Sequence, residues 1–229
     1  MAAKIKVLSA GAVKPGMAKV IEAFGRETGH DVSVSFATAP AIMKRINGGA
    51  TVDVVIAPEN LLAEVAKSGK AAADRVTVGR IGVGVMVRDG APLPKIATVE
   101  EFKRSLLGAE SIVYNQASTG IYLENLFDLL AVAAPIKAKT TRYPDFAAVR
   151  DHVSKGSGNE IGFGATTVII ESASKGVKFA GALPAEIQNY TTYIAATIVD
   201  GVAGVVGEEF VRYLASVRAK ALLTAAGIE

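Results

Sequence analysis

Buried-strand patterns and amphipathic helix patterns alternate along this 229-residue chain, with short links between them. Residues 4–9 and 31–36 predict strands, and residues 16–28 carry apolar side chains at the spacing of one helix face. Residues 52–57 are apolar except for Asp53, which is typical of a strand buried on both faces. Repeated strand–helix units favour parallel sheets covered by helices on both faces. The sequence therefore predicts an α/β fold.

The rest of the chain continues this alternation. Strands are expected at residues 76–87, 111–114, 138–141, 160–164, 177–180 and 190–199, and helices at 41–46, 58–66, 119–132, 146–155 and 166–172, with one helical region over 208–225. Thr98 and Glu101 have the spacing of a capping box at the start of a further helix. A cluster of Asp, Gly and Pro residues at 88–94 is the best boundary signal. It leaves open one continuous sheet or two α/β lobes that the chain connects twice.

Composition excludes several classes of function. Half of the residues are hydrophobic, which supplies a sizeable core, and the absence of Cys excludes disulfides, thiolate metal sites and a Cys nucleophile. His30 and His152 lie far from any second ligand at metal spacing, and no phosphate-binding or dinucleotide glycine motif opens a helix, so neither a metal nor a cofactor is expected.

Charge and hydropathy patterns bear on partners and location. The net charge of +3 is spread along the chain without a basic stripe rich in aromatics, so we expect a small anionic ligand and no nucleic acid. No run of about 18 apolar residues could span a membrane. No export leader precedes the first strand, so we expect a cytoplasmic protein, or a periplasmic one if a leader was removed.

Three loops rich in small and hydroxyl-bearing residues each connect a predicted strand to a helix: residues 9–16, 37–40 and 115–120. In parallel α/β sheets, ligands bind at the carboxyl ends of strands, where helix N-termini present N–H groups. Any one loop alone is better explained as a helix cap with small residues for a tight turn, but three at corresponding positions indicate an anion-binding cleft. Lys14, on the first loop, and then Arg142 are the cations most suited to it.

Several segments together resemble the periplasmic molybdate-binding proteins. They are Val7-Leu-Ser-Ala-Gly-Ala12, Ala23-Phe-Gly-Arg-Glu-Thr-Gly29, Val32-Ser-Val-Ser-Phe36, Ile46-Asn-Gly-Gly49, Val52-Asp-Val-Val-Ile-Ala57, Ser118-Thr-Gly-Ile-Tyr122 and Glu160-Ile-Gly-Phe-Gly164. The resemblance implies a type II periplasmic-binding-protein fold. Lobe one would be residues 1–82 and 195–229 and lobe two residues 83–194, joined by hinge strands near 82–87 and 190–196, with the ligand closed between the lobes.

The departures from the family pattern bear on the ligand. The family holds its oxyanion partly with two serine hydroxyls and a tyrosine hydroxyl, and the matching positions here are Ala12, Ala39 and Phe163. Each lost donor to a buried oxyanion costs about 1–3 kcal/mol. Thr38 and Thr119 compensate only in part, so a ligand with a carbon skeleton is expected in place of molybdate. The ligand-binding candidates are Ala10, Gly11, Ala12, Thr38, Ala39, Ser118, Thr119, Arg142 and Phe163.

An aconitate-isomerase-like branch of this family implies an enzyme. We hypothesise an isomerase or tautomerase that moves a proton and a double bond in a small unsaturated carboxylate, with Lys14 and Arg142 holding carboxylates and Lys14, Tyr122 or Tyr190 moving the proton. The alternative is a substrate-binding protein of an ABC transporter for molybdate or another small anion, with a permease partner only if it is exported. A cytosolic ligand sensor without catalysis is a third hypothesis.

Overall fold

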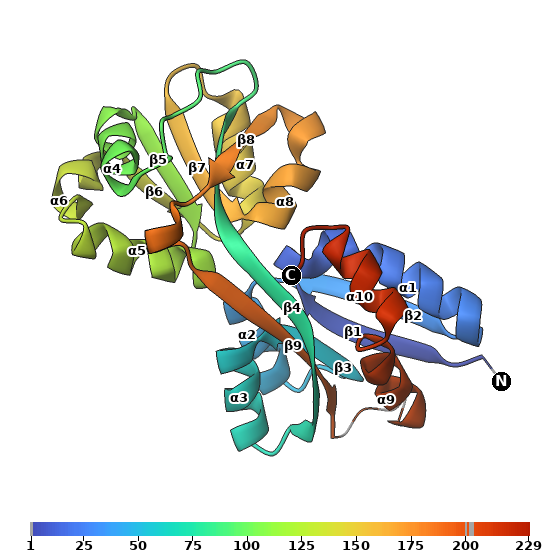
Figure 1. Ribbon diagram of the computed structural model, residues 1–229. Coiled ribbons are helices and arrows are strands. Elements are labelled where there is room, and N and C mark those ends of the chain that lie inside the picture. The colour runs from blue at the N-terminus through green and yellow to red at the C-terminus, as the bar shows by residue number, and fades with distance from the viewer. Residues whose placement is uncertain (1, 200, 202–203) are drawn as a thin grey trace. The chain divides into compact units, whose positions relative to one another are not determined.

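The computed structural model describes residues 2–199, 201 and 204–229, and the chain divides into two compact units (Figure 1). Unit 1 contains the chain up to Ile81 together with Thr191–Glu229, and unit 2 contains Gly82–Tyr190. The chain therefore passes between the units twice. One crossing lies inside a long strand and the other lies at the first residue of a second strand.

Unit 1 is an α/β unit built on a mixed sheet. Its elements are β1 (Lys4–Ala10), α1 (Lys14–Thr28), β2 (Asp31–Ala37), α2 (Ala39–Asn47), β3 (Val54–Pro58), α3 (Glu59–Lys67), the first part of β4 (Ala71–Arg88), β9 (Tyr190–Ile198), α9 (Gly204–Tyr213) and α10 (Val217–Thr224). The strand order is β2-β1-β3-β9-β4. β1 is parallel to β2 and β3, whereas β9 is antiparallel to β3.

The helices of unit 1 follow from its apolar pattern. α1 buries Met17, Val20 and Phe24 on one face, as the helical spacing predicts, and it ends at Gly29, whose φ of +74° is the left-handed conformation that glycine adopts readily. β3 is buried along its whole length, which confirms the expected strand covered on both faces. The helical region expected at 208–225 consists of two helices, and the second begins where the Ser216 hydroxyl accepts a hydrogen bond from Ala219 N.

Unit 2 has the same kind of architecture. Its elements are the rest of β4, α4 (Val99–Gly108), β5 (Ser111–Asn115), α5 (Ser118–Leu129), α6 (Ala133–Ile136), β6 (Thr140–Tyr143), α7 (Phe146–Lys155), β7 (Glu160–Ala165), α8 (Thr166–Glu171) and β8 (Val177–Ala182). The strand order is β4-β7-β5-β6, with β8 also paired to β4. β5 is parallel to β6 and β7, and β4 is antiparallel to β7 and β8.

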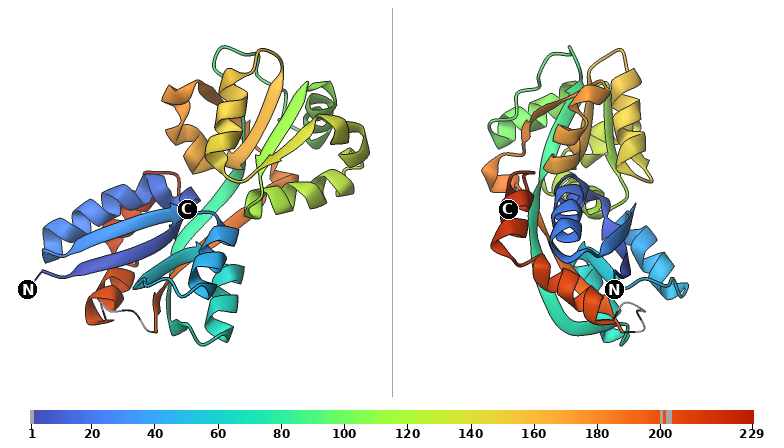
Figure 2. Two further views of the ribbon diagram at one scale, coloured as in Figure 1. Left: turned by 180° about the vertical axis from the view of Figure 1, so that it is seen from behind. Right: turned by 90° about the vertical axis from the view of Figure 1, so that its right-hand side faces the viewer.

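Successive side chains of β5 point to opposite faces of the sheet and so contribute to both hydrophobic clusters of unit 2. Ile112 and Tyr114 belong to the cluster formed with α4, α5 and α6, and Val113 belongs to the cluster formed with α7 and α8. The helices thus cover both faces of this sheet, as expected (Figure 2).

Two expectations about topology were wrong. The sheets are not purely parallel, because the strands in which the chain changes units pair in the opposite direction: β9 is antiparallel to β3, and β4 is antiparallel to β7 and β8. The Pro-containing segment at 88–94 is not a boundary, since the first crossing lies at Ile81/Gly82 within a continuous strand. None of the helices in the described ranges is long and apolar enough to cross a bilayer.

Candidate functional site

Two of the predicted loops lie side by side in unit 1. β1 and β2 pair in parallel up to Ala10 and Ala37, so the starts of α1 and α2 follow at the same edge of the sheet. We call residues 10–14 and 38–39 the unit 1 edge. A side-chain carbon placed on Gly11 would meet no atom within 4 Å, so the main chain of this loop is open to a close approach.

The helices of the unit 1 edge begin without side-chain caps. Val13, the N-cap of α1, has no polar side chain, and the Thr38 hydroxyl at the N-cap of α2 makes no capping hydrogen bond. Thr98 and Ser216 cap α4 and α10, but α3 and α8, which lie away from the predicted loops, also begin without side-chain caps. At α1, Lys14 N already donates to Gly11 O and residue 15 is proline, which has no N–H, so the Lys14 side chain is the clearest donor for an anion there.

Lys14 is the first residue of α1, and its side chain is exposed. Among the described residues it takes part in neither an ion pair nor a side-chain hydrogen bond, and the first turn of α1 contains no acidic residue. A cation at a helix N-terminus is unfavourable by about 0.3–1 kcal/mol, because the helix dipole is positive there. Helix stability therefore does not explain this lysine, whereas an anionic ligand would.

The third predicted loop lies at the corresponding edge of unit 2. β5 ends at Asn115, which pairs with Tyr143 of β6, and Gln116 N donates to Tyr143 O at 2.9 Å. The Asn115 side chain is buried and accepts a hydrogen bond from Ala117 N at 3.0 Å, which sets the turn into α5. The hydroxyls of Ser118 and Thr119 have no partner in the part of the chain that the structure describes. We call residues 115–119 and 142–145 the unit 2 edge.

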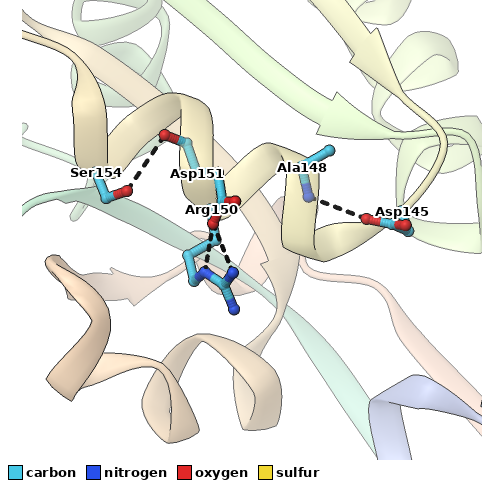
Figure 3. A network of polar contacts seen from close by, with 5 residues as sticks. All are labelled: Asp145, Ala148, Arg150, Asp151 and Ser154. Carbon is cyan, nitrogen blue, oxygen red and sulfur yellow. Dashed lines mark hydrogen bonds and ion pairs between the residues drawn. The ribbon is translucent and has the colours of Figure 1, made fainter.

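α7 also begins at the unit 2 edge, but its start is already capped. The Asp145 carboxylate accepts a hydrogen bond from Ala148 N at 2.9 Å (Figure 3). In the same helix Arg150 Nε donates to Asp151 at 2.9 Å, and this hydrogen bond holds the pKa of Asp151 below its usual range. A carboxylate at the helix start competes with an anionic ligand, so α5 offers the better anion site in this unit.

Arg142 is not a lone surface cation. Its guanidinium lies 2.7 Å from the Glu124 carboxylate of α5, and both side chains are partly exposed. Sequence reasoning found Arg142 but missed Glu124, since nothing in the spacing of residues on separate elements indicates that they meet.

Phe163 lies in the core of unit 2. Its ring has no exposed surface and packs edge-on against Phe102 and Phe127, at centroid distances of 6.0 and 6.1 Å. Alternation along β7 sends Phe163 into this cluster, while Gly162 faces Met86 and Val153. Phe163 is thus a core residue, and its enclosed ring argues against the ligand contact expected from the sequence.

Phe163→Tyr should test this assignment. The new hydroxyl would enter an apolar aromatic cluster without a partner, so we expect the free energy of unfolding to fall by about 1–3 kcal/mol. Urea unfolding followed by circular dichroism measures this loss, and a molybdate titration of the same variant should show no gain in affinity. A variant with unchanged stability and tighter molybdate binding would show that the hydroxyl reaches a ligand.

The two tyrosines expected to move a proton differ. The Tyr122 hydroxyl donates to Ile187 O at 2.6 Å, and burial raises its pKa, so this group is poorly suited to lose a proton. Tyr190 is exposed over 43% of its surface. Glycine at position 82 makes room for it, since a side-chain carbon there would lie 3.3 Å from both the Tyr190 ring and the Gln188 amide.

Sequence reasoning missed Gln188. The Gln188 amide accepts a hydrogen bond from Val83 N at 2.8 Å and donates one to Val83 O at 3.0 Å, and so links β4 to the segment that precedes β9. The two ring nitrogens of His152 are hydrogen-bonded to the Ser111 hydroxyl at 2.9 Å and the Tyr143 hydroxyl at 2.8 Å. No group of three potential metal-ligating side chains gathers among the described residues.

Two α/β units joined by two chain crossings, with parallel strands that lead into uncapped helices, define the type II periplasmic-binding-protein fold. The chain belongs to the bacterial extracellular solute-binding protein family, whose model matches residues 5–229. The resemblance drawn from the sequence is thereby confirmed, and with it the expectation of a small ligand. The family is described as one of extracellular proteins, so the family match does not support the expected cytoplasmic location, which stays a prediction.

The names of individual relatives give different ligands for those proteins. The periplasmic molybdate-binding protein of Azotobacter vinelandii superposes with a TM-score of 0.82 at 19% identity, covering 98% of both chains. The sulfate-binding protein SubI of Mycobacterium tuberculosis does so with a TM-score of 0.77 at 17% identity, over 99% of this chain and 86% of that one. An aconitate isomerase from a Pseudomonas species is 28% identical over 98% of this chain and 87% of its own length. The two structures establish the fold alone.

Proposed function

We propose that this protein binds a small unsaturated polycarboxylate of the aconitate class and isomerises it by moving one proton and the double bond. Lys14 carries the binding part of the proposal, as a cation without a described ion pair at the uncapped start of α1. The similarity to an aconitate isomerase along nearly the whole chain supports the chemical part.

The proposed donors suit carboxylates. At the unit 1 edge these are Lys14, the main chain of residues 10–12 and 39, and the Thr38 hydroxyl. At the unit 2 edge they are the hydroxyls of Ser118 and Thr119 and the Arg142 guanidinium. Ala12 and Ala39 stand where the molybdate-binding pattern has serines, so the unit 1 edge has fewer hydroxyl donors for a compact oxyanion than that pattern provides. This difference favours a ligand with carbon atoms there.

The reaction is a balanced proton shift. A base takes a proton from the CH2 carbon next to the double bond, and the electron pair of that C–H bond forms the new double bond. The electron pair of the old double bond takes a proton at its far carbon. No atom or electron is gained or lost, and cations and N–H groups stabilise the enolate-like charge that develops on the carboxylate. We propose Tyr190 as the base that takes the proton from the CH2 carbon and the Lys14 ammonium as the group that donates a proton at the far carbon.

A second candidate is a receptor of an ABC transporter, which would require a permease partner. The description of the family and the likeness to molybdate-binding and sulfate-binding proteins favour it. The two candidate functions differ in which ligand binds and in whether the bound ligand is chemically converted.

A ligand screen followed by proton exchange tests both candidates. Thermal melting would be measured with cis-aconitate, trans-aconitate, citrate, molybdate and sulfate, since a ligand that binds only the folded state raises the melting temperature. Any stabilising carboxylate would then be followed by proton NMR in deuterated water, with boiled protein as the control.

The isomerase proposal expects stabilisation by an aconitate isomer, interconversion of the two isomers and uptake of deuterium at carbon. Stabilisation by aconitate without exchange or interconversion would contradict catalysis and leave a binding protein. Stabilisation by micromolar molybdate or sulfate alone would contradict the polycarboxylate proposal and favour the transport receptor.

A further inference from the structure

Arg142 at the unit 2 edge and Lys14 at the unit 1 edge differ in whether their positive charge is paired with a carboxylate. Lys14 has no ion pair with any described residue, whereas Arg142 is already paired with Glu124 at 2.7 Å. Side chains thus contribute one uncompensated positive charge at the first edge, whereas the second edge holds the Arg142–Glu124 ion pair and the Asp145 carboxylate that caps α7.

The paired charges lie close to the anion-binding loop of unit 2. Arg142 pairs with Tyr114 in the parallel register of β5 and β6, and the next residue, Tyr143, accepts the hydrogen bond from Gln116 N. Glu124 comes from α5, the helix whose uncapped start carries Ser118 and Thr119. Burial and the Glu124 charge raise the pKa of Tyr114 and the Arg142 charge lowers it, which agrees with both charges lying beside this ring.

We propose that Glu124 is a specificity-determining residue that limits the charge of the ligand accepted at the unit 2 edge, an inference that rests on the proposed polycarboxylate function. A ligand carboxylate that approaches Arg142 must share the guanidinium with Glu124, and it meets the repulsion of that carboxylate. The repulsion grows with the number of negative charges on the ligand. Glu124 therefore weakens the binding of trianions more than that of dianions or monoanions.

The test measures ligand affinity in Glu124→Gln. Glutamine keeps an acceptor for Arg142 and removes the charge. We expect about fivefold tighter binding of the trianion cis-aconitate, a smaller gain for the dianion fumarate and none for the monoanion crotonate, by isothermal titration calorimetry at low salt. The gain should shrink at 0.5 M NaCl. Glu100→Gln is the matched control, because Glu100 lies in the same unit in an exposed ion pair with Lys103.

Arg142→Gln separates competition for the guanidinium from direct repulsion by Glu124. In the Arg142→Gln background, Glu124→Gln should give a smaller gain in affinity than in the original protein, because no guanidinium is left to share and only the direct repulsion is removed. Equal affinities in Glu124→Gln and the original protein, weaker binding, or an equal gain in Glu100→Gln would overturn the inference while leaving the proposed function in place. If the original protein binds none of these carboxylates, both proposals fall.

Discussion

Lys14→Met should weaken the binding of cis-aconitate by at least about tenfold while the empty protein melts at the same or a slightly higher temperature. A hydrogen bond to a charged group contributes about 1.5–3 kcal/mol, and 1.4 kcal/mol corresponds to a factor of ten in affinity. Removal of a cation from the N-terminus of α1 removes an unfavourable interaction with the helix dipole of about 0.3–1 kcal/mol. The two effects have opposite signs, which a purely structural role of Lys14 would not produce.

Calorimetric titration and thermal melting of the same preparation measure both effects. Lys19→Met is the matched control, since Lys19 is an exposed lysine of the same helix that lies away from its first turn. Equal affinities in the two variants would show that Lys14 does not bind the ligand. A large fall in melting temperature of Lys14→Met would show that the lysine supports the fold.

Gly120→Ala should destabilise unit 2 by about 3 kcal/mol and abolish ligand binding at its edge. A side-chain carbon at Gly120 would lie 1.7 Å from Asn115 O and 3.0 Å from the Tyr114 ring. The obstacle is main chain at the end of β5, so relief requires the loop of residues 115–119 to move. That movement would displace Ser118 and Thr119 and break the turn that the Asn115 side chain holds.

Gly108→Ala provides the contrast for this prediction. Gly108 ends α4 in the same unit, and an added carbon there would meet nothing within 4 Å. Alanine at this position should leave stability unchanged or raise it by up to about 1 kcal/mol. Urea unfolding compares the two variants. If Gly120→Ala unfolds at the same urea concentration as Gly108→Ala, the close approach of α5 to β5 is not a constraint.

Much of the fold could be predicted because local patterns report local structure. The spacing of apolar residues in α1, the run of apolar residues in β3 and the capping residue Thr98 each describe a segment whose own burial or hydrogen bonds determine its conformation. The paired loops of the unit 1 edge could also be predicted, because the carboxyl ends of parallel strands share one edge. The antiparallel pairing of β9 with β3 and of β4 with β7 could not be predicted, since strand direction depends on contacts between segments far apart in the chain.

By itself the sequence determined which residues form strands and helices, that no cysteine chemistry operates, and that small residues and Lys14 lead into the helices at the strand ends. These properties depend on residue type and on neighbours along the chain. Only the tertiary structure showed that Glu124 neutralises Arg142, that Phe163 is enclosed by two phenylalanine rings and that the Tyr122 hydroxyl is bound to Ile187 O. Each of these outcomes depends on which side chains meet across separate elements, and folding of the whole unit decides that.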